Sequence, residues 1–196
     1  YYELIKTKKM VEKNINDYRF DEASRNIYQF VWHSYCDWYL ELSKTIFYSD
    51  NKKKIKETKE VAVYIFEKIL ILLHPFIPFI TEKIWLRNSM DKLGKNYLML
   101  ANWPTEKIKK DKENIDVENL IHFISSIRSF KNELGVSPGS FVDISTAKID
   151  KKNRFFLENN DTVLKKLGRI SNFLVKDKNK SSASLVIKGN IFKIYF

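Results

Sequence analysis

Side chains that commonly catalyse reactions or bind metal ions are few in this sequence. The three histidines are scattered, and the single cysteine, Cys36, cannot complete a zinc-ligand set. Cys36 also lies in the most aromatic stretch of the chain, where a buried structural thiol is favoured over a nucleophile. Asp37 and Glu41 would share a helix face, but such carboxylates in a basic protein more often form ion pairs than catalyse. These residues therefore indicate neither a catalytic site nor a metal site.

The sequence also lacks the glycine-rich loop that cradles phosphates in nucleotide-binding enzymes. Gly135 and Gly139 bracket a turn that precedes a predicted strand, which is the reverse of the strand–loop–helix order of such loops. We therefore expect these 196 residues to be non-catalytic and to hold no cofactor.

The composition predicts a folded, basic protein. Hydrophobic residues make up 44% and aromatic residues 14%, which is enough for a core. The net charge is +11 and is spread over both halves of the chain, as expected for a protein that binds a polyanion such as folded RNA or DNA. Most of the basic residues are lysine, however, and a general drift in composition would produce the same excess. Charge alone leaves both explanations open.

Other bulk features bear on the compartment. No run of roughly 18 or more apolar residues occurs, so we expect no membrane span. A single cysteine fits a reducing compartment, and we expect a cytoplasmic protein. The chain begins Tyr1-Tyr2 without an initiator Met or the layout of a signal peptide, which predicts a piece of something longer.

The spacing of apolar residues predicts a mainly helical chain. Apolar side chains recur three and four residues apart, which is the period of one helix face. Pro75 and Pro78 must end one helix, and Pro78 is well placed to begin the next. The predicted helices cover residues 1–18, 21–47, 55–73, 78–91 and 115–134.

The same spacing predicts which helix faces are buried. The helix at 21–47 is apolar around much of its circumference and is expected at the centre of a bundle. Trp38 and the turn at 74–79 are interpreted as packing residues, and His74 is expected to satisfy a nearby backbone group. A second aromatic row in the central helix consists of Tyr28, Trp32, Tyr35 and Tyr39. The inward residues predicted for the helix after residue 78 are Ile80, Ile84 and Trp85.

The period changes after Gly135, which is placed to cap the preceding helix. The predicted elements are then a strand at 141–145, a helix at 151–168 interrupted near 159–160, and strands at 173–176 and 183–188. Gly189-Asn190 predicts a two-residue hairpin turn. The expected fold is mainly α: a five-helix bundle at 1–135, followed by a small α/β subdomain of β-α-β-β-β order at 136–196.

Three runs of residues resemble the anticodon-binding region of valyl-tRNA synthetases. The first is YRFDEA at 18–23, followed by YQFVW at 28–32 and CDWYLE at 36–41; the last part is very similar to a run in the valine enzymes. The second, LHPFIPFITEKIW at 73–85, is shared with the isoleucine and leucine enzymes and indicates only the class. The third is Ile127-Arg128 with ELGVSPG at 133–139. The resemblance covers about residues 1–146.

This resemblance implies a class Ia ligase that attaches valine to tRNA(Val) with ATP and magnesium. The signatures of its catalytic domain do not occur in these residues, so the resemblance places the catalytic and editing domains upstream in the same chain. The coiled-coil arm of the family is not found either. The expected partner of this region is the anticodon stem-loop of tRNA(Val), and the expected oligomeric state is a monomer.

Contact with RNA requires exposed cations for phosphate and exposed aromatic or amide groups for unstacked bases. The resemblance implies that bases are read beside the first helix and beside the loop after the fourth. Each candidate also has an ordinary explanation as a solvated side chain, and Arg128 suits the end of its helix through the helix dipole. The candidates are Arg19, Arg87, Asn88, Lys92, Lys95, Asn96, Tyr97 and Arg128.

Two other hypotheses remain open at this point. The chain could be the corresponding piece of an isoleucyl- or leucyl-tRNA synthetase, although the run at 36–41 favours valine. It could also be a helical protein–protein interaction domain whose charge is incidental. Salt dependence separates the last hypothesis, because only phosphate neutralisation predicts a steep fall of affinity with salt.

Overall fold

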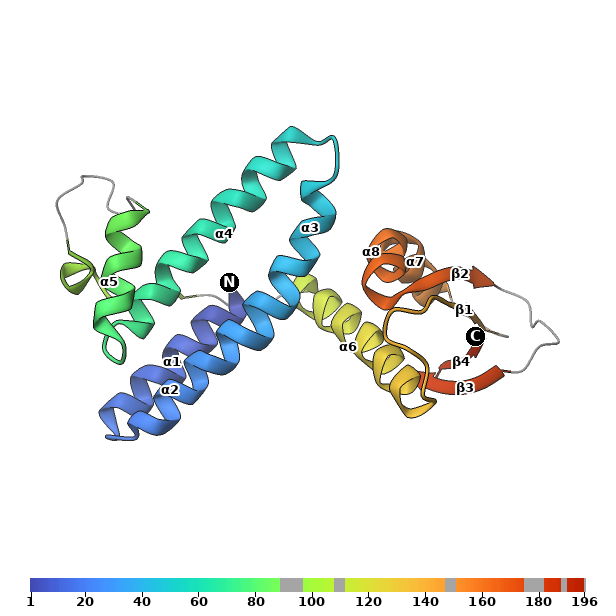
Figure 1. Cartoon of the computed structure of the whole chain (residues 1–196), viewed down its shortest axis with the longest axis horizontal. Helices are drawn as coiled ribbons and strands as arrows, with labels where there is room; N and C mark the ends of the chain where they lie inside the picture. Colours follow the sequence, from blue (N-terminus) through green and yellow to red (C-terminus); the bar gives the residue numbers. More distant parts are fainter. Residues whose placement is uncertain (89–96, 108–111, 147–150, 175–181, 188–189, 196) are drawn as a thin grey trace. The chain divides into compact units, whose positions relative to one another are not determined.

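The computed structural model describes residues 1–88, 97–107, 112–146, 151–174, 182–187 and 190–195. These residues form two compact units, Tyr1–Lys110 and Asp111–Phe196. The first unit is helical, and the second combines helices with a four-stranded sheet (Figure 1). The mainly α fold and the order of elements predicted from the sequence are confirmed.

The first unit begins with a helical hairpin. Helix α1 (Tyr2–Asn16) lies beside a continuous helical segment made of α2 (Phe20–Gln29), η1 (Phe30–Leu40) and α3 (Glu41–Phe47) (Figure 1). The η1 stretch has the wider, π-helical hydrogen-bonding pattern. The chain continues through α4 (Lys52–Leu73), α5 (Pro78–Arg87) and a 3₁₀ turn, η2 (Leu98–Leu100).

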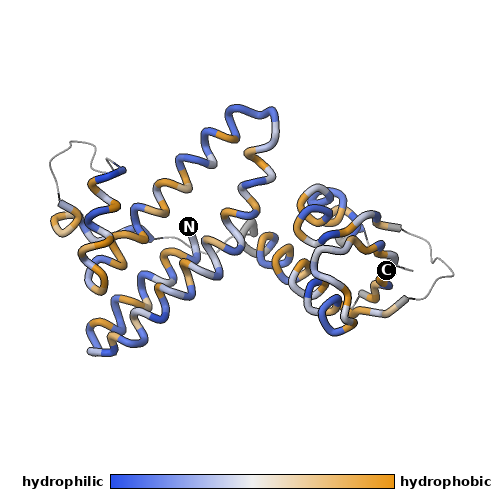
Figure 2. Tube along the Cα trace, viewed as in Figure 1, coloured by the Kyte–Doolittle hydropathy of each residue, from blue (hydrophilic) through white to orange (hydrophobic). Residues whose placement is uncertain are grey.

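Local signals set the ends of α4 and α5. Asn51 caps α4 by accepting a hydrogen bond from the Lys54 amide at 3.0 Å, so the helix begins three residues before the predicted start at 55. The helix ends at Leu73, and Pro78 occupies the first turn of α5, as the sequence predicted. Hydropathy rises along α4 from a hydrophilic beginning to an apolar end (Figure 2).

Two groups of buried side chains hold this unit together. The larger one joins α1, α2, η1 and α4, and consists of Leu4, Val11, Ala23, Ile27, Phe30, Tyr35, Ile65, Ile69 and Leu72. The smaller one joins the end of α4 to α5 and η2, and consists of Leu70, Ile71, Trp85 and Leu98. The core therefore fills only the apolar half of α4, and residues 52–54, 56, 57, 59 and 60 are exposed.

The π-helical stretch corrects the predicted aromatic row. Phe30 and Tyr35, five residues apart, are both buried, which is the repeat of an i to i+5 helix and not of an α-helix. Tyr28 and Trp32 instead stack on each other on the surface, with ring centroids 6.4 Å apart and Trp32 53% exposed. Trp38, predicted as core, is half-buried. The α-helical spacing used for the prediction does not hold where the number of residues per turn changes.

A different correction applies to α5. Trp85 is buried and Ile84 is half-buried, but Ile80, predicted to face inward, is half exposed. Thr81 takes the inward position, because its hydroxyl bonds to the carbonyls of Ile77 and Pro78 and contacts His74. The helix phase is therefore set by a polar contact that apolar spacing does not reveal.

The second unit contains α6 (Lys112–Glu133), α7 (Lys151–Asn159), α8 (Asp161–Gly168) and one sheet. Its strands are β1 (Val142–Ser145), β2 (Ile170–Leu174), β3 (Ser182–Ile187) and β4 (Asn190–Tyr195), in the order β2-β1-β4-β3. Strand β1 pairs parallel with β2 and antiparallel with β4. The predicted β-α-β-β-β order is confirmed. Ile187 pairs with Asn190, so Asn190 belongs to β4 and not to the predicted turn.

Helix α6 belongs to this unit, whereas the sequence predicted it as the fifth helix of the bundle at 1–135. Phe123 of α6 meets Phe192 of β4 edge to face at 5.2 Å and Phe156 of α7 at 6.3 Å. Its apolar stripe, with Ile124 and Ile127 fully buried, therefore has neighbours within its own unit. Gly135, with φ +68°, ends the helix as predicted.

Candidate nucleic-acid interface

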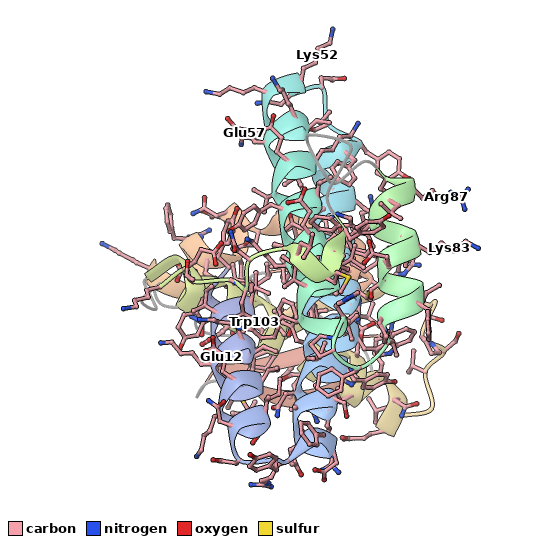
Figure 3. All side chains as sticks on the ribbon, turned by 90° about the vertical axis from the view of Figure 1, so that its left-hand side faces the viewer. Glu12, Lys52, Glu57, Lys83, Arg87 and Trp103 are labelled. Atoms are coloured by element: carbon pink, nitrogen blue, oxygen red, sulfur yellow. The ribbon has the colours of Figure 1, made fainter. Side chains whose placement is uncertain are left out.

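The surface of α5 combines cations with apolar groups. Lys83 and Arg87 lie four residues apart, one helical turn, and both project away from the bundle (Figure 3). Asn88 follows Arg87 and donates its amide hydrogen to the Ile84 carbonyl at 2.8 Å, which caps the end of α5. The two cations therefore share one outward face of a well-defined helix.

A shallow hollow of about 470 Å³ lies between α5 and η2. Its lining includes Phe79, Leu86 and Met99, all exposed, together with Lys83. Phe79 is 91% exposed, and with the exposed Leu86 and Met99 it forms an apolar patch of the kind that marks a binding surface. An exposed ring beside cations provides what an unstacked base and its phosphate need.

Polar contacts fix the shape of this hollow. His74 Nδ1 lies 2.9 Å from the Thr81 hydroxyl, so the expectation that His74 satisfies a backbone group was wrong. Glu82 accepts hydrogen bonds from the amides of Leu98 at 2.9 Å and Met99 at 3.4 Å. The turn, α5 and η2 are therefore tied together, and the exposed groups sit on a fixed frame.

The segment after η2 is fastened to α1 and α4. Trp103 donates from Nε1 to Glu12 of α1 at 2.9 Å (Figure 3). Glu106 accepts a hydrogen bond from the Tyr64 hydroxyl and forms an ion pair with Lys68 at 3.0 Å. The Tyr64 hydrogen bond, and to a smaller extent Lys68, lowers the pKa of Glu106 to about 2. The carboxylate is therefore ionised at neutral pH and holds both partners.

The corner between α1 and α2 presents a second aromatic and cationic surface. Tyr18 has φ +57°, a left-handed conformation that is unfavourable for a side chain of this size, and it is almost fully exposed. Its ring meets that of Phe20, also exposed, edge to face at 6.3 Å. Arg19 lies between them in sequence and forms a long 3.8 Å ion pair with Glu22. Strained, exposed aromatic residues of this kind are typical of binding surfaces.

Lysines gather at the beginning of α4. Lys52, Lys53 and Lys54 occupy its first turn, and the first turn contains no acidic residue. The positive end of the helix dipole lies there, so each lysine is placed where a cation is unfavourable. Lys52 projects from the tip of the helix (Figure 3). A nearby polyanion would reverse this penalty.

The structure places the predicted contact residues in different ways. Arg19, Arg87, Asn88 and Tyr97 belong to the first unit and are exposed. Arg128 belongs to the second unit, where Nε and Nη2 both donate to the Leu167 carbonyl, at 3.1 and 2.8 Å. The structure therefore gives Arg128 a backbone contact within its own unit. The remaining three, Lys92, Lys95 and Asn96, lie outside the described residues.

Several exposed groups were missed by the sequence interpretation. Phe79 was assigned to packing because it stands in an apolar run, and Tyr18 was placed only as the last residue of the helix predicted at 1–18. In sequence Phe79 looks like the packed residues of the same apolar run, so no signal marked it as exposed. Lys83 and Lys52 could have been found only from their neighbours in space.

Chemistry other than binding finds little support in the described residues. No three His, Cys, Asp or Glu side chains among them are placed to hold a metal ion. Burial, and to a lesser extent Asp37, raises the pKa of the Cys36 thiol, whereas an activated nucleophile needs a lowered one. None of the helices in this part of the chain combines the length and apolar character needed to cross a membrane.

Comparisons with known proteins point to one kind of protein. Residues 1–146 match the family model for the anticodon-binding domain of tRNA ligases. The valine–tRNA ligase of Pelagibacter ubique (strain HTCC1062) is 57% identical over all of this chain, which covers 22% of that protein. Those of Zymomonas mobilis and Agrobacterium fabrum are 35% and 31% identical over 94% and 95% of this chain, and 21% and 20% of those proteins. The chain thus spans about a fifth of the length of the curated relatives it matches.

Proposed function

The chain belongs to the family of anticodon-binding domains of tRNA ligases, and we propose that it binds the anticodon stem-loop of tRNA(Val). The observation that carries the proposal is the exposed frame of α5 and η2, where Phe79 and Lys83 line one hollow and Arg87 is exposed one turn further along α5. Bases of a single-stranded loop stack on aromatic rings, and phosphates between them pair with cations. The corner at Tyr18, Arg19 and Phe20 offers the same chemistry.

We propose further that the chain works as part of a longer valine–tRNA ligase. Valine–tRNA ligases at 57%, 35% and 31% identity support valine over the isoleucine and leucine alternatives. The catalytic and editing chemistry, with ATP and magnesium, is then the task of the other parts of that protein. A monomer in the cytoplasm is the expected state.

A binding titration with the chain and a fluorescently labelled anticodon hairpin of tRNA(Val) tests the function. Phosphate neutralisation predicts that log affinity falls linearly with log salt, with a slope of roughly −3 or steeper for about four contacts. Arg87→Ala should weaken binding and lower this slope by about one, with no change in melting temperature. Lys59→Ala, which removes an exposed cation of α4, is the matched control and should leave both unchanged.

Two outcomes would contradict the proposal. A shallow salt slope would favour a protein-binding domain, because a packed protein interface responds weakly to salt. Equal affinity for hairpins of tRNA(Val) and tRNA(Ile), and for a hairpin with a scrambled anticodon, would show that the chain binds RNA without reading the anticodon.

A further inference from the structure

The second unit contains a cavity with an unusual lining. It has a volume of about 360 Å³ and lies between the end of α6, the turn that follows it and the corner between α8 and β2. Three cations line it: Arg128, Lys131 and Arg169. Among the described lining residues there is no carboxylate, and Asn132 adds an amide. The cavity is therefore strongly positive.

Each of these cations has a contact with a neutral group. Lys131 is only 2% exposed, and its ammonium donates to the carbonyls of Pro138 and Ser140. Arg128 donates twice to the Leu167 carbonyl, as described above. Arg169 lies over the ring of Phe141, with 5.4 Å between its guanidinium carbon and the ring centroid. The protein thus places three positive side chains around one space, and the carbonyl groups that contact Lys131 carry no charge to neutralise it.

Bringing these charges together costs free energy. Burial of a lysine without a carboxylate partner is expensive, and like charges nearby add to the cost. Burial, followed by repulsion from Arg169 and Arg128, lowers the pKa of Lys131. An anion in the cavity would reduce both penalties.

The backbone at Arg169 provides an independent observation. Arg169 follows the last residue of α8 with φ +54° and ψ 51°, the left-handed conformation that glycine usually supplies at this place. An L-residue other than glycine pays roughly 1–2 kcal/mol there. Strain at one residue that also lines a cavity is typical of a functional position. The backbone conformation that places Arg169 at the cavity is therefore kept at the expense of stability.

We propose that this cavity is an oxyanion site that binds a phosphate group. Guanidinium groups bind phosphate through paired hydrogen bonds, and an ammonium group adds a point charge. The phosphate could be that of an RNA backbone or a free phosphate ion. The RNA source rests on the function proposed above, whereas the free ion does not.

The first test titrates the chain with inorganic phosphate at constant ionic strength, with chloride as the balancing ion. Amide resonances of residues 131, 132, 168 and 169 should shift in a saturable way in NMR spectra. Arg169→Gly is the decisive variant, because glycine accepts the left-handed backbone and removes only the side chain. Its melting temperature should be equal to or higher than that of the parent, and its phosphate affinity at least about tenfold lower. Lys151→Gln, an exposed lysine of α7, should change neither.

A second arm separates the two sources of phosphate. If the site binds RNA, Arg169→Gly weakens binding of full-length tRNA(Val) and reduces the salt slope by about one. If tRNA affinity is unchanged while phosphate affinity falls, the site is retained and its ligand is a free phosphate. The proposal is overturned if phosphate produces no shift beyond chloride, or if Arg169→Gly binds phosphate as tightly as the parent. Failure of tRNA binding as such would contradict the anticodon function without affecting the phosphate test.

Discussion

Phe79 and Trp85 lie on the same short helix and should respond to truncation in opposite ways. Trp85 is 8% exposed and packs with Leu70, Ile71 and Leu98, whereas Phe79 is 91% exposed. Trp85→Ala removes a large core side chain and leaves a cavity. Phe79→Ala removes a ring that contacts mainly solvent. The pair therefore separates the folding role of α5 from its binding role.

The magnitudes follow from burial. Trp85→Ala should lower the free energy of unfolding by about 3–5 kcal/mol, the usual cost of an aromatic truncation in a core. Phe79→Ala should change it by no more than about 0.5 kcal/mol, as for other surface substitutions. If one base stacks on Phe79, its loss should cost about 1–3 kcal/mol of binding, or roughly 5- to 150-fold in Kd.

Tryptophan fluorescence during urea unfolding measures the first effect. All four tryptophans lie in the first unit, so the signal reports that unit separately from the sheet. Trp85→Ala still leaves three of them as reporters. Fluorescence anisotropy of a labelled tRNA(Val) anticodon hairpin measures the second effect, at a fixed salt concentration.

Two results would refute this reasoning. A loss of more than about 2 kcal/mol of unfolding free energy in Phe79→Ala would show that the ring is packed, because surface truncations rarely cost so much. Unchanged RNA affinity in the same variant would show that no base stacks there. Phe79→Trp, which keeps a flat ring, is the matched control and should retain binding.

Three further predictions concern single side chains. Lys52→Glu should raise the free energy of unfolding of the first unit by about 0.3–1 kcal/mol, because an anion suits the beginning of α4. The same variant should bind RNA more weakly. Unchanged RNA affinity would show that Lys52 is not part of the interface. Glu106 has a pKa lowered from 4.5 to about 2, so the ionised carboxylate stabilises the fold above pH 4.5. The difference in unfolding free energy between the parent and Glu106→Gln should therefore disappear as the pH falls from 4.5 to 2. A difference that stays constant across this range would be inconsistent with the ion pair. Burial raises the pKa of Tyr35 to about 12, and its hydroxyl donates a hydrogen bond to the Ala62 carbonyl. Tyr35→Phe should therefore lower the free energy of unfolding by about 0.5–1.5 kcal/mol. In urea titrations this difference should be constant below pH 10 and decline from pH 10 to 12.

The secondary structure was predictable because its signals are local. Asn51, Pro78 and Gly135 mark helix ends through their own backbone chemistry, and the alternation at 141–145 marks a strand. The partners of an element are not local. Helix α6 has an apolar stripe that fits a bundle or a sheet equally well, and Phe192, some seventy residues later in the chain, is one of the residues that place it with the sheet.

The candidate site was predictable only in part. Arg19, Arg87 and Tyr97 are exposed, as contact candidates must be, because cations and aromatics near the ends of helices are easily exposed. Phe79 was missed because an apolar run looks the same in sequence whether its residues pack inside or outside. Trp32 was misplaced because the π-helical stretch changes the spacing of the buried face. In both cases the residue type can be read from the sequence, but the local geometry of the helix decides whether the side chain points inward or outward.

The first unit departs from what stability alone would favour at three places: a tyrosine in a left-handed turn at Tyr18, a bare ring at Phe79, and lysines at the positive end of α4. The left-handed tyrosine and the lysines are unfavourable for the isolated fold, the bare ring adds nothing to it, and all three suit a surface that meets bases and phosphates. A sequence under selection for folding alone would lose such residues, because most alternatives at these positions are more stable. Arg169 repeats the pattern in the second unit, where a left-handed backbone carries a cation instead of glycine. The same test therefore applies to all four: a substitution that leaves the stability of the chain unchanged or raises it, and weakens RNA or phosphate binding, shows that the residue is kept for its ligand.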